Sequence, residues 1–450
     1  MKSTIRTFYL IIITQTISLI GSSMTGFAIG IKVFNDTGQV TPLALVGFFS
    51  QLPRILSASF AGVVADRWDR RKILIFSDSG QAVGTLILLL AFATDNFSLW
   101  ILYVVVLIQA VFEVFQSPAL SATVTMLVPD EQRDLANTIQ QINRPAASIV
   151  APIVAGFLFV LIGVTGVMAI DIISFFVAIG ALYLVHIPRP KATAEGEKSR
   201  GSVLKEAWSG FQFLLERRLL FYVILYATLL NFLFNGAGIM MTPYILSLTN
   251  SEAALGAVMA SLGLGMVSGG IAFSMWRNKP GRIHIFFVGI ILSGLFMSIL
   301  GITRTVLLLV IVKFISFFPN PAVNASLMSL IQIKTPPDMQ GRVFASIMQL
   351  AMLATPLAFL IAGPLADQVL EPAVGTPGWS IVEPVVGAQP GSGMGLLMVI
   401  NGLVVVITGL LLYNWKPIRN LEDSLPDYIP EAEDEVNEAV SEDKVALATG

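Results

Sequence analysis

The dominant feature of this sequence is a series of long apolar runs separated by short polar segments. A helix needs roughly 20 apolar residues to cross the hydrocarbon core of a bilayer. The runs predict twelve such helices, near 7–33, 43–65, 73–94, 98–126, 135–161, 165–186, 219–248, 252–275, 284–302, 305–332, 342–370 and 394–414. A hydrophobic content of 55% is also high for a soluble domain, so we expect an all-α, twelve-helix membrane protein.

The predicted helices fall into two groups of six. Residues 1–186 are expected to form an N-terminal bundle and residues 219–414 a C-terminal bundle, joined by the charged segment 187–218. We expect this segment to lie in the cytoplasm and to include an interfacial helix, whose apolar face would carry Leu204, Trp208, Phe211 and Leu215. The alternative is that it only leads into helix seven. A weak internal repeat supports the division, although chance alignment also explains it; Pro129, Asp130 and Gln132 recur 208 residues later as Pro337, Asp338 and Gln340.

Lysine and arginine are concentrated on one side of the predicted helices, with Arg304 as the main exception. Because basic residues mark the cytoplasmic ends of membrane helices, both termini are predicted to be cytoplasmic. Residues 415–450 form an acidic tail: from 420 to 450 there are ten acidic side chains and one lysine. Such a composition predicts a disordered, solvated segment, with binding of a partner as the alternative.

Several classes of chemistry are disfavoured by what the sequence lacks. It has no cysteine and only two histidines, so disulfides and thiolate chemistry are excluded and a histidine-built metal site is not expected. A phosphate-binding Gly-x-x-x-x-Gly-Lys-[Ser/Thr] loop is also missing, which argues against direct use of ATP. We expect no enzyme activity, no cofactor, no metal and no nucleic-acid partner.

A charged segment between the second and third apolar runs carries the most specific motif. Its order is Gly, two residues, Ala, Asp, Arg, one residue, Asp, Arg, Arg, Lys, over residues 62–72. This order resembles the loop motif between helices two and three of the major facilitator superfamily. The resemblance implies that Asp66 ends helix two beside the cytoplasmic start of helix eleven, as part of a conformational latch. Its residues would be Gly62, Asp66, Arg67, Asp69, Arg70 and Arg71. The alternative is a turn that only sets orientation.

The resemblance covers residues 5–415. The sequence around Leu52, Pro53 and 117–119 is similar to that of the macrolide-efflux and siderophore-export branch of the superfamily. It implies a monomer in the inner or plasma membrane of a prokaryote. Residues 147–156 in helix five are similar to the glycine-proline signature of drug and proton antiporters, with alanine at three glycine positions. Ala151, Pro152 and Gly156 are the expected hinge, and ordinary packing of small residues is the alternative.

Charged side chains within the predicted spans are candidate site residues, because a charge in lipid is costly unless it faces a cavity or a partner. Glu113 in helix four and Arg144 in helix five are expected at similar depth. We hypothesise that Glu113 binds the coupled proton and that Arg144 is its counter-charge. A static ion pair is the alternative. Arg54, also within a span, is interpreted as a packing residue.

Polar side chains on several helices are expected to line a central substrate cavity, although plain helix packing would also explain them. The set is Gln15, Ser18, Gln109, Gln116, Asp171, Asn231, Asn235, Lys313 and Asn320. With the resemblance, it predicts a secondary exporter of small, largely apolar molecules such as drugs, macrolides or siderophores. The exporter would work by alternating access and proton antiport. An uptake symporter is the first alternative, and a non-transporting receptor or scaffold is the second.

Overall fold

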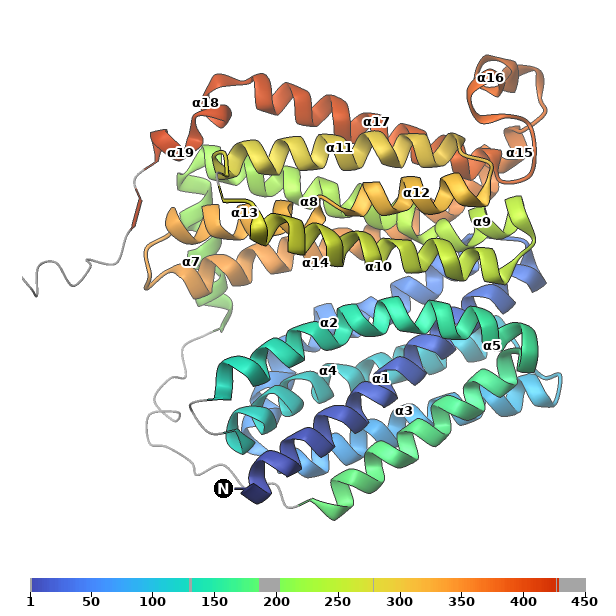
Figure 1. Ribbon diagram of the computed structural model, residues 1–450, viewed down its shortest axis with the longest axis vertical. Helices are drawn as coiled ribbons and strands as arrows, with labels where there is room; N and C mark the ends of the chain where they lie inside the picture. Colours follow the sequence, from blue (N-terminus) through green and yellow to red (C-terminus); the bar gives the residue numbers. More distant parts are fainter. Residues whose placement is uncertain (1, 129–131, 186–202, 278, 426, 429–450) are drawn as a thin grey trace, which may run out of the picture.

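The computed structural model describes residues 2–128, 132–185, 203–277, 279–425 and 427–428. It leaves out the side chains of 2–5, 58–67, 203–209 and several between 125 and 145. The described residues form helices and no strand, which confirms the predicted all-α class. The helices gather into two bundles, the N-terminal one drawn below the C-terminal one in Figure 1. Among the described residues, ten helices are long and apolar enough to cross a membrane. The count of twelve therefore stays a prediction.

The N-terminal bundle contains α1 (Lys2–Thr37), α2 (Thr41–Arg67), α3 (Arg70–Ala93), α4 (Leu99–Leu127) and α5 (Arg133–Leu184). α5 includes both the fifth and the sixth predicted spans. It breaks at Gly163, whose φ of 66° lies in the left-handed region that glycine adopts without steric cost. The two limbs run in opposite directions from this break (Figure 1). This reversal lets one continuous helical segment cross the bundle twice.

In the described part of the chain, eight helices make up the C-terminal bundle. They are α8 (Arg218–Ile239), α9 (Met241–Thr249), α10 (Glu252–Met275), α11 (Arg282–Ile302), α12 (Val306–Phe317), α13 (Asn320–Ile333), α14 (Gln340–Leu365) and α17 (Ser392–Asn414). The predicted spans 219–248 and 305–332 are each two helices. Pro243 lies in the first turn of α9 and Pro321 in that of α13. Since proline has no N–H to donate, it is tolerated at such starts and interrupts a longer helix.

The segment between α14 and α17 consists of short helical elements. It contains η2 (Ala366–Leu370), α15 (Glu371–Ala373), η3 (Pro377–Ile381) and α16 (Glu383–Val386). Trp379 is 3% exposed, and its indole Nε1 donates to the carbonyl of Gly387 at 2.7 Å. The Glu371 carboxylate accepts from the backbone N–H groups of Gly391 and Met394 at the start of α17. This apolar anchor and cap order a segment that composition alone marks as a loop.

Three short elements lie at the end of the molecule that carries the N-terminus, here called the α7 end (Figure 1). They are α7 (Val203–Glu216), α18 (Lys416–Arg419) and α19 (Leu421–Ser424). On α7, Phe213 and Leu214 are buried within the protein and Leu215 is exposed. The membrane-facing role of this helix stays a prediction. Leu204 and Trp208 lie outside the described side chains.

The start of the predicted tail is also ordered, contrary to expectation. Ile418 and Leu421 are fully buried against the C-terminal bundle, and the Glu422 carboxylate accepts from the N–H of Ile283 at 2.6 Å. Lys334 forms an ion pair with Asp427 at 2.6 Å. Apolar side chains within 415–428 pack against the bundle, although the acidic composition of the tail predicted that it would be disordered. Residues 429–450 lie outside the described part of the chain.

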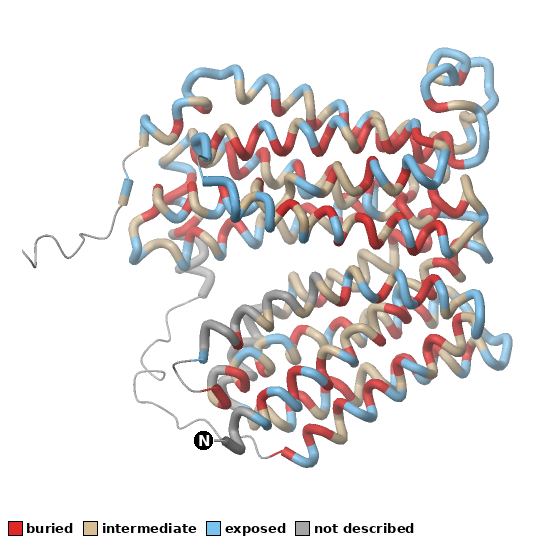
Figure 2. The backbone as a smooth tube through the Cα atoms, viewed as in Figure 1, coloured by how far each residue is buried: buried red, intermediate tan, exposed pale blue. Residues whose placement is uncertain are grey.

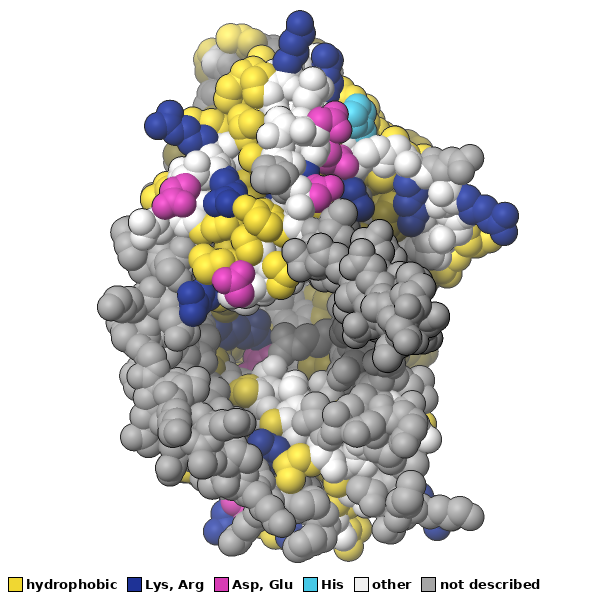
Figure 3. Space-filling model, turned by 90° about the vertical axis from the view of Figure 1, so that its left-hand side faces the viewer, with side chains coloured by type: hydrophobic (Ala, Val, Ile, Leu, Met, Phe, Trp, Pro, Cys, Tyr) yellow, Lys and Arg dark blue, Asp and Glu magenta, His cyan; other side chains and the backbone are white. Residues whose placement is uncertain are grey.

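The two bundles meet at the opposite end of the molecule, here called the α15 end. Buried residues are concentrated inside each bundle and where the bundles meet on the right of Figure 2. At the α7 end a hollow separates them, with charged side chains visible inside it (Figure 3). The space between the bundles is therefore open at one end and closed at the other.

Candidate functional site

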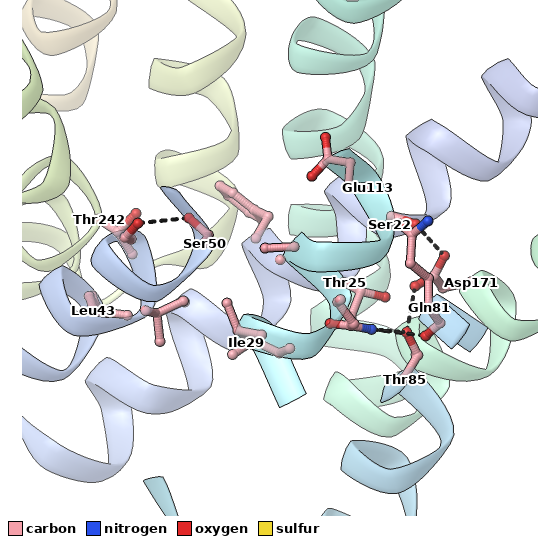
Figure 4. Close-up of a pocket in the computed structure, with 18 of the residues that line it drawn as sticks. Ser22, Thr25, Ile29, Leu43, Ser50, Gln81, Thr85, Glu113, Asp171 and Thr242 are labelled. Atoms are coloured by element: carbon pink, nitrogen blue, oxygen red, sulfur yellow. Dashed lines mark hydrogen bonds between the residues drawn. The ribbon is translucent and has the colours of Figure 1, made fainter. Parts of the chain in front are cut away.

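A cavity of about 380 Å³ lies where the two bundles face each other. The N-terminal bundle supplies most of its polar wall, including Gln109 and Asp171. Gly238, Ile239 and Thr242 close it from the C-terminal bundle. Figure 4 shows Thr242 beside Ser50 of α2, away from the polar side chains around Asp171. The cavity thus has one wall from each bundle.

A second cavity, of about 220 Å³, adjoins the first. The two share Ser22, Gln81, Glu113 and Phe175 as lining residues. The second cavity is also lined by the predicted residues Gln15, Ser18 and Gln116. Five of the nine predicted cavity residues therefore line two connected spaces in and beside the N-terminal bundle.

The predicted residues of the C-terminal bundle lie elsewhere. Asn231 and Asn320 line a separate cavity of about 170 Å³. Asn235 does not line that cavity, and its amide donates to the backbone carbonyl of Asn231 at 2.7 Å. Lys313 is 5% exposed, with its Nζ 4.6 Å from the ring centroid of Phe317. The single cavity expected from the sequence is divided by the tertiary structure.

Glu113 forms an ion pair with Arg54 of α2, with 2.5 Å between Oε1 and Nη2. Each side chain is 30% exposed, so the pair faces the cavity and is not sealed within the bundle. The packing interpretation of Arg54 was incomplete, because its guanidinium carries charge to the cavity wall. The side chain of Arg144 lies outside the described residues, so its predicted pairing stays a prediction.

Asp171 lies on the second limb of α5 and is 1% exposed. Its carboxylate accepts hydrogen bonds from the hydroxyls of Ser22 at 3.1 Å, Thr85 at 3.4 Å and Ser174 at 3.5 Å. Figure 4 shows Ser22 and Thr85 pointing at it from α1 and α3. Hydroxyl donors satisfy its oxygens without neutralising the charge.

Asp78 on α3 is a buried carboxylate that the sequence analysis did not single out. It is 0% exposed and accepts from Gln15 Nε2 at 2.8 Å and from Gln116 Nε2 at 2.5 Å. It falls within the predicted span 73–94, so the cost of a charge within a span was a sufficient signal to find it. Two predicted cavity residues are therefore partners of an acid that the prediction omitted.

The described latch residues tie helix ends within the N-terminal bundle. Asp69 is the N-cap of α3, and its carboxylate accepts from the N–H groups of Arg71 and Lys72. Arg70 donates to the carbonyl of Ala122 on α4 at 3.0 Å. Arg71 donates to the carbonyls of Leu182 and Tyr183, each at 2.7 Å. The side chains of Asp66 and Arg67, and residue Gly62, lie in the part of α2 whose side chains are not described.

The predicted hinge in α5 packs against α10. Ala151 and Gly156 are buried, and a Cβ added to Gly256 of α10 would lie 2.9 Å from the carbonyl oxygen of Pro152. A Cβ on Gly156 would lie 3.1 Å from the carbonyl oxygen of Glu252. Small residues on both helices therefore allow the backbones of the two bundles to approach closely.

A second contact between the bundles closes the α15 end. Asp367 in η2 accepts from the backbone N–H of Val40 at 2.9 Å and of Thr41 at 2.6 Å. These N–H groups stand at the start of α2, where the helix dipole favours a negative charge. Beside them, a Cβ on Gly363 would lie only 2.8 Å from Ala44. One carboxylate thus joins the end of α14 to the start of α2.

Metal chemistry finds no support in the part of the chain that the structure describes. No group of three or more histidine or acidic side chains converges there. The polar groups around the cavities are amides, hydroxyls, two buried carboxylates and one ion pair. This arrangement is suited to binding and releasing a solute or protons.

Comparison with protein families and curated proteins gives consistent matches. The family model described as "Major Facilitator Superfamily" matches residues 11–359. Macrolide efflux protein A of Streptococcus pyogenes is 27% identical over 380 residues, covering 80% of this chain and 90% of the relative. The enterobactin exporter EntS of Citrobacter koseri is 24% identical over 346 residues, covering 75% and 79%.

Solved structures with the same architecture include a bacterial homologue of the human lysosomal transporter Spinster, in an inward-facing, unoccupied conformation. The TM-score is 0.70 at 15% identity, with 91% of this chain and 96% of the other covered. At this identity the likeness is one of fold.

Proposed function

Because the chain belongs to the Major Facilitator Superfamily, we propose that it is a secondary active exporter of small, largely apolar molecules, driven by inward proton flow. Family membership makes it a multi-pass membrane transporter of small molecules and not an enzyme, as the motif at residues 62–72 predicted. The direction of transport, the substrate class and the coupling ion belong to the proposal. Relatives named as macrolide, multidrug and enterobactin exporters support export.

The observation that carries the proposal is the cavity between the bundles, with its asymmetric access. Both bundles line it, the α7 end is hollow, and Asp367 and the α5 to α10 contact close the other end. If the α7 end is cytoplasmic, as the basic residues indicate, this conformation is open to the cytoplasm. A substrate entering there would leave after the bundles rock, opening the α15 end.

Glu113 is the proposed proton-binding residue of the cavity. Its carboxylate lines both cavities of the N-terminal bundle and is partly exposed, so protons and solutes can reach it. Protonation would weaken its ion pair with Arg54 and remove a charge from the wall. The wall would then differ between the state that takes up substrate and the state that releases it. Arg144 remains a proposed further partner.

The motif residues at the α7 end have a proposed role in the same cycle. Asp69, Arg70 and Arg71 hold the ends of α3, α4 and α5 together. We assign Asp66 a contact with the start of α14 that forms when the α7 end closes. The Asp66 contact would then hold the α7 end closed in one conformation, and the Asp367 contact would hold the α15 end closed in the other. All of these contacts lie within one chain, which we propose acts as a monomer.

Inverted membrane vesicles test the proposal. With an inside-acid proton gradient, vesicles containing the full chain should accumulate radiolabelled erythromycin, a macrolide, or ethidium, a lipophilic dye. Glu113→Gln should abolish the gradient-driven component while binding of the same compound stays measurable. Glu383→Gln, which alters an exposed acid in α16, is the matched control. Accumulation only in right-side-out vesicles would instead indicate an uptake symporter, and no gradient-linked flux of any compound would indicate a receptor or scaffold.

A further inference from the structure

A chain of hydrogen bonds, which passes through the backbone carbonyl of Gln81, links Asp78 and Asp171, the two buried carboxylates among the described residues of the N-terminal bundle. From Asp78 it passes through Gln116 to Gln81, whose Nε2 donates to Gln116 Oε1 at 2.9 Å. Gln109 then donates to the carbonyl of Gln81 at 2.9 Å and to Thr85 Oγ1 at 3.1 Å. Thr85 in turn donates to Asp171. The chain crosses α3, α4 and α5 and runs along both cavities.

Each carboxylate is buried without a cation within 4 Å among the described side chains. Removing a charge from water is costly, and amide or hydroxyl donors offset only part of that cost. Binding of a proton removes the charge and therefore lowers the remaining desolvation free energy of the carboxyl group. A purely structural acid would be expected to have a lysine or arginine beside it.

The charged groups facing this interior come from the neighbouring helices. Glu113 on α4 and Asp171 on α5 line the cavities, and Arg54 on α2 is paired with Glu113. From α1, the uncharged Gln15 faces Asp78. On α3 itself, Arg70, Arg71 and Lys72 lie six to eight residues away, about 9–12 Å along the helix. Arg70 and Arg71 donate to backbone carbonyls of α4 and α5. Asp78 therefore has no nearby basic group among the described side chains.

The donors around Asp78 all point toward it. An ionised carboxylate only accepts hydrogen bonds, and here Gln15 and Gln116 both turn their NH₂ groups to it. When a proton binds, one oxygen becomes a donor and needs an acceptor. Gln15 or Gln116 can supply it by rotating its amide so that the carbonyl faces Asp78. When Gln116 rotates, its carbonyl no longer accepts from Gln81, which breaks a bond in the chain. Gln116 and Gln81 line the cavities, so this rotation changes the groups that a substrate meets.

We propose that Asp78 is a second proton-binding residue of the transport cycle, whose protonation is transmitted to the cavity wall by rotation of the Gln116 amide. The step adds one proton to a carboxylate oxygen and breaks no covalent bond. This inference rests on the proposed proton-driven export. It adds a second proton-binding residue, the buried Asp78, to the partly exposed Glu113.

Two measurements that need no substrate test the role of Asp78. The full chain has no cysteine, so Ser50→Cys places a single thiol on the cavity wall. Because a maleimide reacts with the thiolate, each labelling rate is divided by the rate for free cysteine at the same pH. In reconstituted protein we expect this ratio to change at least about tenfold between mildly alkaline and mildly acidic pH, a shift of about 1.4 kcal/mol in conformational preference. Adding Asp78→Asn should reduce this change below about twofold. The infrared carbonyl stretch of protonated carboxylic acids, followed over the same pH change, should lose a component in Asp78→Asn.

Two further variants make the result decisive. Asp95→Asn makes the same chemical change at the exposed turn after α3, and it should leave the pH response intact. Gln116→Met keeps the acid but removes the amide, so it should retain the Asp78 infrared component and lose the labelling response. A full response in either Asp78→Asn or Gln116→Met overturns the proposal. Failure of the proposed function is separate: it would appear as absent gradient-driven flux in the unmodified chain.

Discussion

The contact between Asp367 and the start of α2 makes the sharpest prediction about conformation. Its carboxylate accepts two backbone hydrogen bonds, from Val40 at 2.9 Å and Thr41 at 2.6 Å, across the boundary between the bundles. Hydrogen bonds to charged groups contribute about 1.5–3 kcal/mol, and a charge at a helix start adds about 0.3–1 kcal/mol at an exposed site. Asp367→Asn keeps one acceptor oxygen and loses the charge. Since Asp367 is partly exposed, we take the low end, about 1.5 kcal/mol, which is a population shift of about tenfold.

The direction follows from where the contact lies. It exists with the α15 end closed, so its loss should favour the conformation that opens there. In right-side-out vesicles carrying Ser50→Cys, a membrane-impermeant maleimide should label the cavity about tenfold faster when Asp367→Asn is added. Glu383→Gln, in the same segment between α14 and α17, should not change the rate. An unchanged or slower rate with Asp367→Asn would refute the reasoning, because the contact would then be equally present in both conformations.

Three further outcomes are expected. The variant carrying both Arg54→Gln and Glu113→Gln should lose less stability than the sum of the losses in the two single variants, with a coupling of about 0.5–3 kcal/mol in thermal or denaturant unfolding. Strict additivity would show that the two side chains are not coupled. Gly256→Ala should lower stability by about 1–3 kcal/mol, because its Cβ would press on the Pro152 carbonyl, whereas Gly180→Ala, with open space around it, should not. Lys313→Met should raise the unfolding temperature, since this buried ammonium has only an aromatic partner among the described residues; a lower temperature would indicate a favourable role for the charge.

The sequence by itself determined that the protein lies in a membrane, that its fold is all-α, and to which family it belongs. Apolar runs long enough to cross a bilayer leave helices as the simplest way to satisfy backbone hydrogen bonds in lipid, so the all-α class follows from composition and run length. The charged motif at residues 62–72 identified the family because its spacing is specific. Glycine and proline positions also located the close approach of α5 to another helix, although not which helix it meets.

Tertiary structure decided which polar residues act together. Gln15, Gln116 and Asp78 are 38 to 101 residues apart in sequence but form one hydrogen-bonded group. Helix periodicity predicts which residues lie on the same face of a helix, but not which neighbouring helix that face contacts. For the same reason the predicted cavity set was divided between separate spaces, and Arg54 proved to be a partner of Glu113. Asp367 closes one end of the molecule only because folding carries the end of α14 to the start of α2, more than 300 residues away.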